Sequence, residues 1–216
     1  MKSRVRLSLL LPILATLTAC GPAASITQGA AATPKGFDLS AWDVSTTGSG
    51  PVAAEANGGV DLFLPASTRG DLQQQNLIVL RLTARCQLAA DFDLQVDYAL
   101  TTWPARNGVR FGLAAGPDAV ERTTNPVNTD NTYATDFSGT IVQDATTNKS
   151  GRLRLARVGT TVTGYYRSNG TWVSIASATA AATSVTFAIQ AWTDSNTFNR
   201  QDVRVNLKNV TATGCS

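Results

Sequence analysis

The sequence predicts an all-β protein, a two-sheet antiparallel β-sandwich with very little helix. Residues 91–100 (DFDLQVDYAL) alternate apolar and polar side chains, the pattern of a strand with one buried face. Asn169-Gly170 lies between two strand-like runs, and both residues tolerate the positive φ angles of a hairpin turn. No stretch of the sequence sustains the 3.6-residue period of an amphipathic helix.

A meander over residues 152–175 (RLRLARVGTTVTGYYRSNGTWVSI) organises the predicted sheet. Its first strand alternates leucine with arginine and ends at Gly159-Thr160. Its second strand places Tyr166 inward and Tyr165 outward, and its third follows the Asn-Gly turn. We therefore expect three short antiparallel strands joined by two tight turns.

The rest of the chain reads as further short strands between turn signals. Residues 37–44 open the domain, and Pro65 ends a strand because proline cannot donate to a ladder. The nearly continuous apolar run 77–82 predicts a strand buried on both faces, separate from the strand at 91–100. The remaining expected strands span 52–56, 60–64, 109–114, 120–123, 133–137, 140–142, 184–192 and 203–210, with a loop or short helical turn at 178–183.

The first 20 residues (MKSRVRLSLLLPILATLTAC) resemble a bacterial lipoprotein signal peptide. A basic start precedes a short apolar run that ends in Leu17-Thr18-Ala19-Cys20. In that family the peptide is cut before the cysteine, which is then acylated, so Cys20 is the expected lipidation site. The alternative is an ordinary signal peptide. The resemblance implies export to a bacterial cell envelope, and Gly21 after the cysteine implies the outer membrane in a Gram-negative source.

The predicted organisation is a leader at 1–19, a flexible Ala/Gly/Pro/Ser-rich tether at 20–36 and one β-sandwich domain at 37–216. The chain has 18 Lys+Arg against 15 Asp+Glu, and the excess of three lies in the leader as Lys2, Arg4 and Arg6. The mature chain is therefore formally neutral. No basic stripe remains for nucleic acid, and we expect membrane contact only through the lipid anchor.

Two cysteines remain in the domain, Cys86 and Cys215. An exported protein matures in an oxidising compartment, where such a pair forms a disulfide. A bridge between them would fasten the C-terminal strand to an earlier one.

The strand order resembles the concanavalin A-like lectin/glucanase superfamily, which includes the laminin G-like domains. The resemblance rests on the opening FDLSAWDV, the paired segments DFDLQVDYAL and NGVRFGLAAG, the 152–175 meander, and the final VTFAIQAW and DVRVNLKNVTATG. It covers about residues 37–214. It implies a jelly roll, and either carbohydrate binding or polysaccharide hydrolysis.

The residues argue against the hydrolytic branch. The chain has no histidine, and its two glutamates, Glu55 and Glu121, are far apart in sequence. Asp91, Asp93 and Asp97 share one face of a strand, but we interpret them as a solvated face because nothing nearby would split their pKa values.

Outward positions on the predicted strands carry side chains that suit a sugar. Aromatic rings stack on sugar rings, and arginine, amide and carboxylate groups bind hydroxyls. The alternative is that these aromatics cover sheet edges. The predicted carbohydrate-binding residues are Gln95, Asp97, Arg110, Tyr165, Gln190 and Trp192.

No cofactor is expected, although Asp130 and Asp194 lie in loops of the kind that bind calcium, and they are equally ordinary turn residues. The leading hypothesis is a lipid-anchored, lectin-like domain that binds a glycan or another envelope component without catalysis. The alternatives are a glycoside hydrolase or lyase with an atypical carboxylate site, and a structural or adhesion module with a protein partner.

Overall fold

The computed structural model describes residues 37–215, and the predicted leader and tether lie outside them. The described chain is almost entirely β, with two short 3-10 helices, η1 (Leu39–Ala41) and η2 (Leu72–Gln74). Its strands are β1 (Trp42–Thr47), β2 (Val52–Ala56), β3 (Gly59–Leu64), β4 (Leu77–Thr102), β5 (Arg110–Ala115), β6 (Asp118–Thr124), β7 (Asn131–Phe137), β8 (Thr140–Ala145), β9 (Ser150–Val158), β10 (Thr161–Ser168), β11 (Thr171–Thr179), β12 (Val185–Asp194) and β13 (Val203–Cys215).

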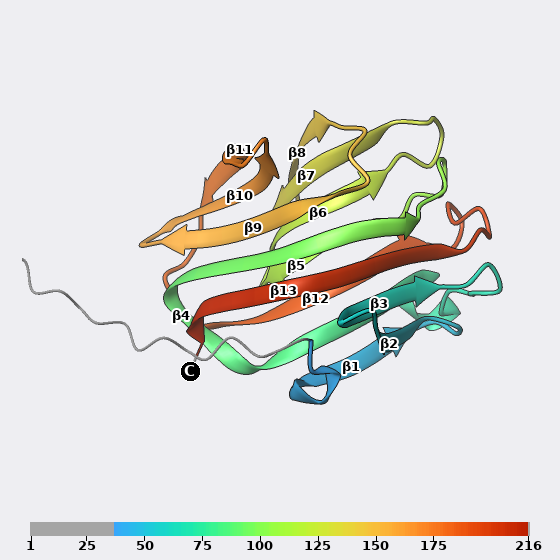
Figure 1. The fold of residues 1–216 in the computed structure, drawn as a ribbon, viewed down its shortest axis with the longest axis horizontal. Helices are drawn as coiled ribbons and strands as arrows, with labels where there is room; N and C mark the ends of the chain where they lie inside the picture. Colours follow the sequence, from blue (N-terminus) through green and yellow to red (C-terminus); the bar gives the residue numbers. More distant parts are fainter. Residues whose placement is uncertain (1–36, 216) are drawn as a thin grey trace, which may run out of the picture. The chain divides into compact units, whose positions relative to one another are not determined.

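The strands form two antiparallel sheets that share β4. Sheet 1 has the order β2-β3-β13-β4-β9-β10-β11, and sheet 2 has the order β1-β4-β12-β5-β6-β7-β8. The first part of β4 pairs with β1 and β12, and the second part pairs with β13 and β9. Figure 1 shows β4 as a single ribbon that bends between the two layers.

This continuity corrects one prediction. The runs 77–82 and 91–100 were expected to be separate strands, but they belong to one strand of 26 residues. The intervening residues 83–90 include Arg85 and Cys86, and the alternation of more buried and more exposed positions continues through them without a break. The register of β12 against β4 shifts between Thr186 and Ala188, close to the place where β4 changes sheets.

The core lies between the sheets and comes from the apolar half of each alternation. Val96, Phe111 and Ile189 are fully buried, as their strand positions predicted. Tyr98 of sheet 1 packs against Phe111 of sheet 2 with ring centroids 5.7 Å apart. Tyr133 and Tyr166 stack across the same interior at 4.1 Å. In both of these pairs, one ring comes from sheet 1 and the other from sheet 2. The two sheets therefore pack face to face, as in a β-sandwich.

The predicted disulfide is present. Cys86 of β4 and Cys215 of β13 are bonded, with Cα atoms 5.6 Å apart and a sequence separation of 129. The bridge joins the last strand to β4 where β4 passes from one sheet to the other. In the described part of the chain, no helix has the length and apolarity needed to cross a membrane.

Candidate functional site

The outer face of sheet 2 carries a row of polar and aromatic side chains. The strand register places Trp192 of β12 opposite Arg110 of β5, Arg110 opposite Thr123 of β6, and Thr123 opposite Thr132 of β7. Because side chains directly opposite one another on antiparallel strands are close neighbours, these residues line one path across the sheet. Gly112 lies beside this row, between Gln190 and Glu121 in the same register.

Arg110, Glu121 and Trp192 form a compact triad at the centre of this face. The Nε atom of Arg110 lies 2.8 Å from Oε2 of Glu121. The indole Nε1 of Trp192 donates a hydrogen bond of 2.8 Å to Oε1 of the same carboxylate. The guanidinium of Arg110 lies over the Trp192 ring, 4.9 Å from its centroid. Glu121 therefore holds both partners at once and fixes the direction of the arginine.

Glu121 is buried although it lies on the outer face. The side chain of Arg110 is 16% exposed, whereas that of Glu121 is 2% exposed. Burial raises the pKa of the Glu121 carboxyl, and the attraction of Arg110 and the hydrogen bond from Trp192 only partly offset this rise. A ligand in solution therefore reaches the arginine but not the carboxylate that positions it.

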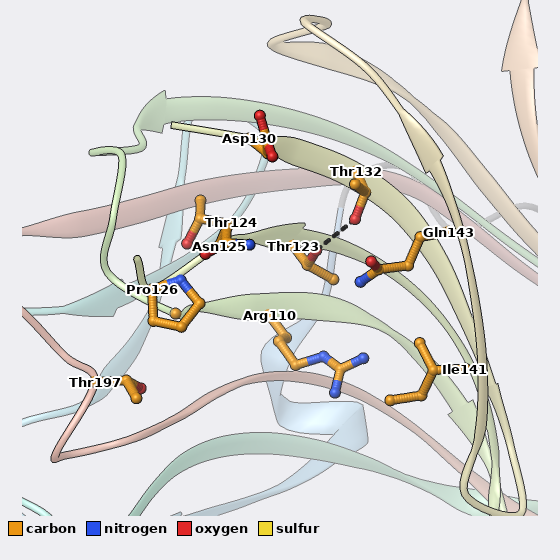
Figure 2. A pocket seen from close by; sticks show the side chains of 11 residues that line it. Arg110, Thr123, Thr124, Asn125, Pro126, Asp130, Thr132, Ile141, Gln143 and Thr197 are labelled. Atoms are coloured by element: carbon orange, nitrogen blue, oxygen red, sulfur yellow. Dashed lines mark hydrogen bonds between the residues drawn. The ribbon is translucent and has the colours of Figure 1, made fainter. Parts of the chain in front are cut away.

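A pocket of about 250 Å³ opens beside Arg110. Figure 2 shows the guanidinium extending toward Gln143 and Ile141 on β8, and shows the hydrogen bond of 2.7 Å between the Thr123 and Thr132 hydroxyls. The pocket is lined by Gly108, Arg110, Thr123, Thr124, Asn125, Pro126, Asp130, Thr132, Ile141, Gln143 and Thr197. Its lining thus joins one cation with amides and hydroxyls, groups that bind a ligand rich in hydroxyls or acceptor oxygens.

The structure divides the six predicted carbohydrate-binding residues between two faces. Arg110, Gln190 and Trp192 lie together on the outer face of sheet 2. Gln95, Asp97 and Tyr165 lie on the outer face of sheet 1. Each side chain points outward as its alternation predicted, but outward means opposite directions for the two layers. The six residues predicted as one carbohydrate-binding set therefore form two separate surfaces.

On sheet 1 the predicted residues join a network of charges. Asp97 pairs with Arg152 at 3.3 Å and accepts a hydrogen bond of 2.7 Å from Asn209. The guanidinium of Arg154 lies 4.9 Å from the centroid of the Tyr165 ring. Gln95 donates to Asp93, which also pairs with Arg154. Asp93 and Asp97 are thus each paired with an arginine on the outer face of sheet 1.

Sequence reasoning missed Glu121, Thr123, Thr132 and Gln143 as members of the sheet 2 site. The sequence does indicate that Glu121 points outward. Val120 is an apolar residue expected in the core, and successive side chains on a strand point to opposite faces. No sequence pattern showed that this carboxylate faces Arg110 on the adjacent strand. That fact depends on the register of β5 against β6.

The two candidate calcium loops are built as side-chain turns. Asp194 accepts a hydrogen bond from the backbone N–H of Asn196, and Oδ2 of Asp130 accepts one from Asn128. Within residues 37–215, no three carboxylate, cysteine or histidine side chains gather in a group able to hold a metal ion.

No protein-family model matches the chain, and a comparison with curated proteins finds no relative. Solved structures match at the level of fold. The alginate lyase AlyA1 of Zobellia galactanivorans superposes with a TM-score of 0.57 at 9% identity, covering 83% of this chain and 96% of that one.

A functionally unknown protein from Saccharomyces cerevisiae gives 0.55 at 11% identity, covering 82% and 98% of the two chains. The exoplasmic domain of VIP36, bound to Ca²⁺ and Man3GlcNAc, gives 0.55 at 11% identity, covering 82% and 84%. These likenesses show a jelly-roll sandwich, in agreement with the fold that the sequence resemblance implied.

Proposed function

We propose that this protein binds a glycan on the outer face of sheet 2 and does not act on it chemically. The observation that carries this proposal is the pre-oriented guanidinium of Arg110, which is held from behind by a buried carboxylate and opens into a pocket of hydroxyls and amides. An arginine fixed in this way presents its terminal N–H groups without the entropy cost of ordering a free side chain.

The half-buried ring of Trp192 and the amide of Gln190 extend the proposed surface beyond the pocket. Gln190 lies next to Trp192 on the outer face of β12, with Ala191 between them pointing into the core. An aromatic ring offers an apolar face to a sugar ring, while arginine and amide groups exchange hydrogen bonds with its hydroxyls. Sugar-binding neighbours of the same fold, such as VIP36 with Man3GlcNAc, lend support to this reading.

Burial of Glu121 supports binding without catalysis. Two-carboxylate hydrolysis needs a proton donor and a second carboxylate that both contact the substrate. Glu121 is 1% exposed and already holds Arg110 and Trp192. Asp136, the next carboxylate on this face, accepts a hydrogen bond from the backbone N–H of Gly139 in a turn. This geometry suits a positioning role for Glu121.

A hydrolase or lyase is the second candidate. The raised pKa of Glu121 is what a catalytic acid requires, and solved structures of the same fold include alginate lyases. The third candidate, an adhesion module, would bind protein and no sugar. Release of reducing ends or of unsaturated sugars from a polysaccharide, abolished by Glu121→Gln, would establish the enzyme in place of the binding domain.

The proposed setting is a bacterial cell envelope. Cys20 would carry the lipid anchor, and residues 20–36 would hold the domain away from the membrane. These residues lie outside the described part of the chain. The Cys86–Cys215 bridge fits an oxidising compartment, which supports export. A Cys20→Ser variant that still partitions with membranes, with no acyl mass on the wild type, would contradict the anchor.

The glycan site is tested by calorimetric titration of the purified protein with neutral xylo-, manno- and cello-oligosaccharides. Arg110→Lys keeps the charge but loses the planar fork, so we expect about tenfold weaker binding, roughly 1.4 kcal/mol. Gln143→Ala removes one exposed pocket amide and should cost about 0.5–1.5 kcal/mol of binding free energy.

Gln74→Ala is the matched control, because Gln74 is exposed in η2 and outside the pocket. It should bind like the wild type. Equal losses in Gln74→Ala and Gln143→Ala, or no binding of any oligosaccharide by the wild type, would reject the sheet 2 site.

A further inference from the structure

We infer that the outer face of sheet 1 is a second binding surface, separate from the proposed glycan site, and that its ligand is an acidic polysaccharide. The surface centres on Arg154, Tyr165, Arg167 and Trp172, which we call the arginine–aromatic cluster. These side chains come from β9, β10 and β11, and they lie on the layer opposite to the Arg110 pocket.

The cluster interleaves two rings with two guanidinium groups. Tyr165 and Trp172 have ring centroids 6.5 Å apart, and Arg154 lies 4.9 Å from the first and 5.7 Å from the second. The guanidinium of Arg167 lies 6.0 Å from the centroid of the Trp172 ring. Tyr165 and Trp172 keep part of their area in solvent, although both rings are large and apolar. Aromatic rings and arginines arranged in this way form a typical recognition surface.

The centre of the cluster is fixed before any ligand arrives. Arg154 donates to Oδ2 of Asp93 from Nε at 2.9 Å and from Nη2 at 2.6 Å. Oδ1 of Asp93 accepts a hydrogen bond of 3.0 Å from Gln95. Asp93 thus fixes the position of the Arg154 guanidinium, and this guanidinium lies close to both rings. A ligand therefore meets rings whose positions are already set, which lowers the entropy cost of binding.

The charge of this face favours an anion. The cations on it come from Arg152, Arg154, Arg167, Arg204 and Lys208, and the carboxylates come from Asp61, Asp91, Asp93 and Asp97. The five cations exceed the four carboxylates by one, and Arg204 is paired with Asp61. Arg152 and Arg154 are paired with two of these aspartates, whereas Arg167 and Lys208 enter no ion pair within residues 37–215. The two unpaired cations flank the face from β10 and β13.

Sugar chemistry fits this face better than nucleic-acid chemistry. The side chains of Asp93 and Asp97 are 27% and 34% exposed, so they can accept hydrogen bonds from a ligand. A polysaccharide offers hydroxyl donors for these carboxylates, and its carboxylate or sulfate groups can pair with Arg167 and Lys208. A DNA backbone offers only acceptor oxygens and dense negative charge, which the two aspartates would repel.

The inference is tested with polygalacturonate as the acidic probe and a thymidine oligonucleotide as the competing anion, using the purified protein. Arg167→Gln should weaken polygalacturonate binding about tenfold, because it removes an unpaired cation and its ring contact. Trp172→Ala should weaken it by a similar factor. Added salt should weaken the binding of polygalacturonate by the wild type, and it should reduce the difference in affinity between the wild type and Arg167→Gln.

Arg200→Gln provides the matched control, since Arg200 is exposed in the β12–β13 loop and its substitution removes the same charge. It should bind polygalacturonate like the wild type. Thermal melting confirms that each variant is folded, and Arg167→Gln keeps the test valid if Trp172→Ala is unstable, because Arg167 is exposed.

The inference would be overturned by no binding of polygalacturonate, by equal weakening in Arg200→Gln and Arg167→Gln, or by tighter binding of the oligonucleotide. Arg110→Lys separates this surface from the proposed glycan site. If Arg110→Lys abolishes polygalacturonate binding and Arg167→Gln does not, the acidic polymer binds sheet 2 and the second surface is rejected. If the protein binds polygalacturonate but no neutral oligosaccharide, the proposed glycan site on sheet 2 is rejected and the binding surface on sheet 1 stands.

Discussion

A single buried carboxylate determines the geometry of the sheet 2 face. Glu121 receives the indole N–H of Trp192 on one oxygen and faces the Arg110 Nε on the other. The two groups that would touch a ligand are thus arranged by a residue that a ligand cannot reach. The sequence alone predicts that Val120 points inward and Glu121 outward. It does not predict the contact of Glu121 with Arg110, because that contact depends on the pairing of β5 with β6.

The raised pKa of Glu121 gives a pH-dependent contribution to stability. The folded state binds a proton more tightly than the unfolded chain, so the free energy of unfolding should fall as pH rises from the ordinary glutamate pKa, about 4.3, through the raised folded value. Above the folded-state pKa of Glu121, this contribution to the free energy of unfolding is lost completely. Glu121→Gln cannot titrate and should lack this part of the slope. Denaturant unfolding of both proteins across pH measures it, and parallel curves for the two would contradict the prediction.

Individual elements show where sequence patterns were sufficient and where they failed. Alternation placed Val96, Phe111 and Ile189 correctly in the core, because side chains point to opposite sides along any strand. The same rule does not say which sheet a strand joins. It therefore grouped Tyr165 with Trp192, although β10 and β12 belong to opposite layers. The assignment of strands to layers depends on long-range pairing, which a local pattern does not contain.

Gly164 of β10 allows the two layers to approach closely. A Cβ atom there would lie 2.4 Å from Cγ2 of Thr135 on β7, and 3.3 Å from Val120 on β6. Gly164→Ala should therefore destabilise the fold by about 1–3 kcal/mol through overpacking. Denaturant unfolding measures the loss.

Thr135→Ser removes the methyl group that the new Cβ would meet, so it provides the double-mutant control. Thr135→Ser combined with Gly164→Ala should recover part of the lost stability. Strictly additive losses in the double variant would show that the two layers do not collide at this position.

At the scale of the whole molecule, one strand and one bridge connect the two layers. β4 contributes to both sheets, and Cys86 lies within it. The sequence predicted the bridge from export and cysteine count, and predicted the sandwich from its many short strands. The continuity of β4 was missed although the alternation runs through residues 83–90 without a break, because that alternation does not show that the strand changes partners from β1 and β12 to β13 and β9.

The bridge should contribute substantially to stability. It closes a loop of 129 positions, for which the chain-entropy relation gives on the order of 5 kcal/mol as an upper value. Cys86→Ala with Cys215→Ala should lower the free energy of unfolding by up to about that amount. Denaturant unfolding measures the change. Two free thiols in a non-reduced peptide map of the native protein would show instead that the bridge does not form.

The same bridge alters how the molecule responds to tension. A pull between residue 37 and the C-terminus follows the shortest covalent path, which leaves β4 at Cys86 and passes directly to Cys215. Residues 87–214 are outside that path, and they include Arg110, Glu121 and Trp192 as well as Tyr165 and Trp172. While the bridge is intact, only β1, β2, β3 and the first part of β4 lie on the path that bears the tension. Reduction of the bridge would add residues 87–214, and with them both outer faces, to that path.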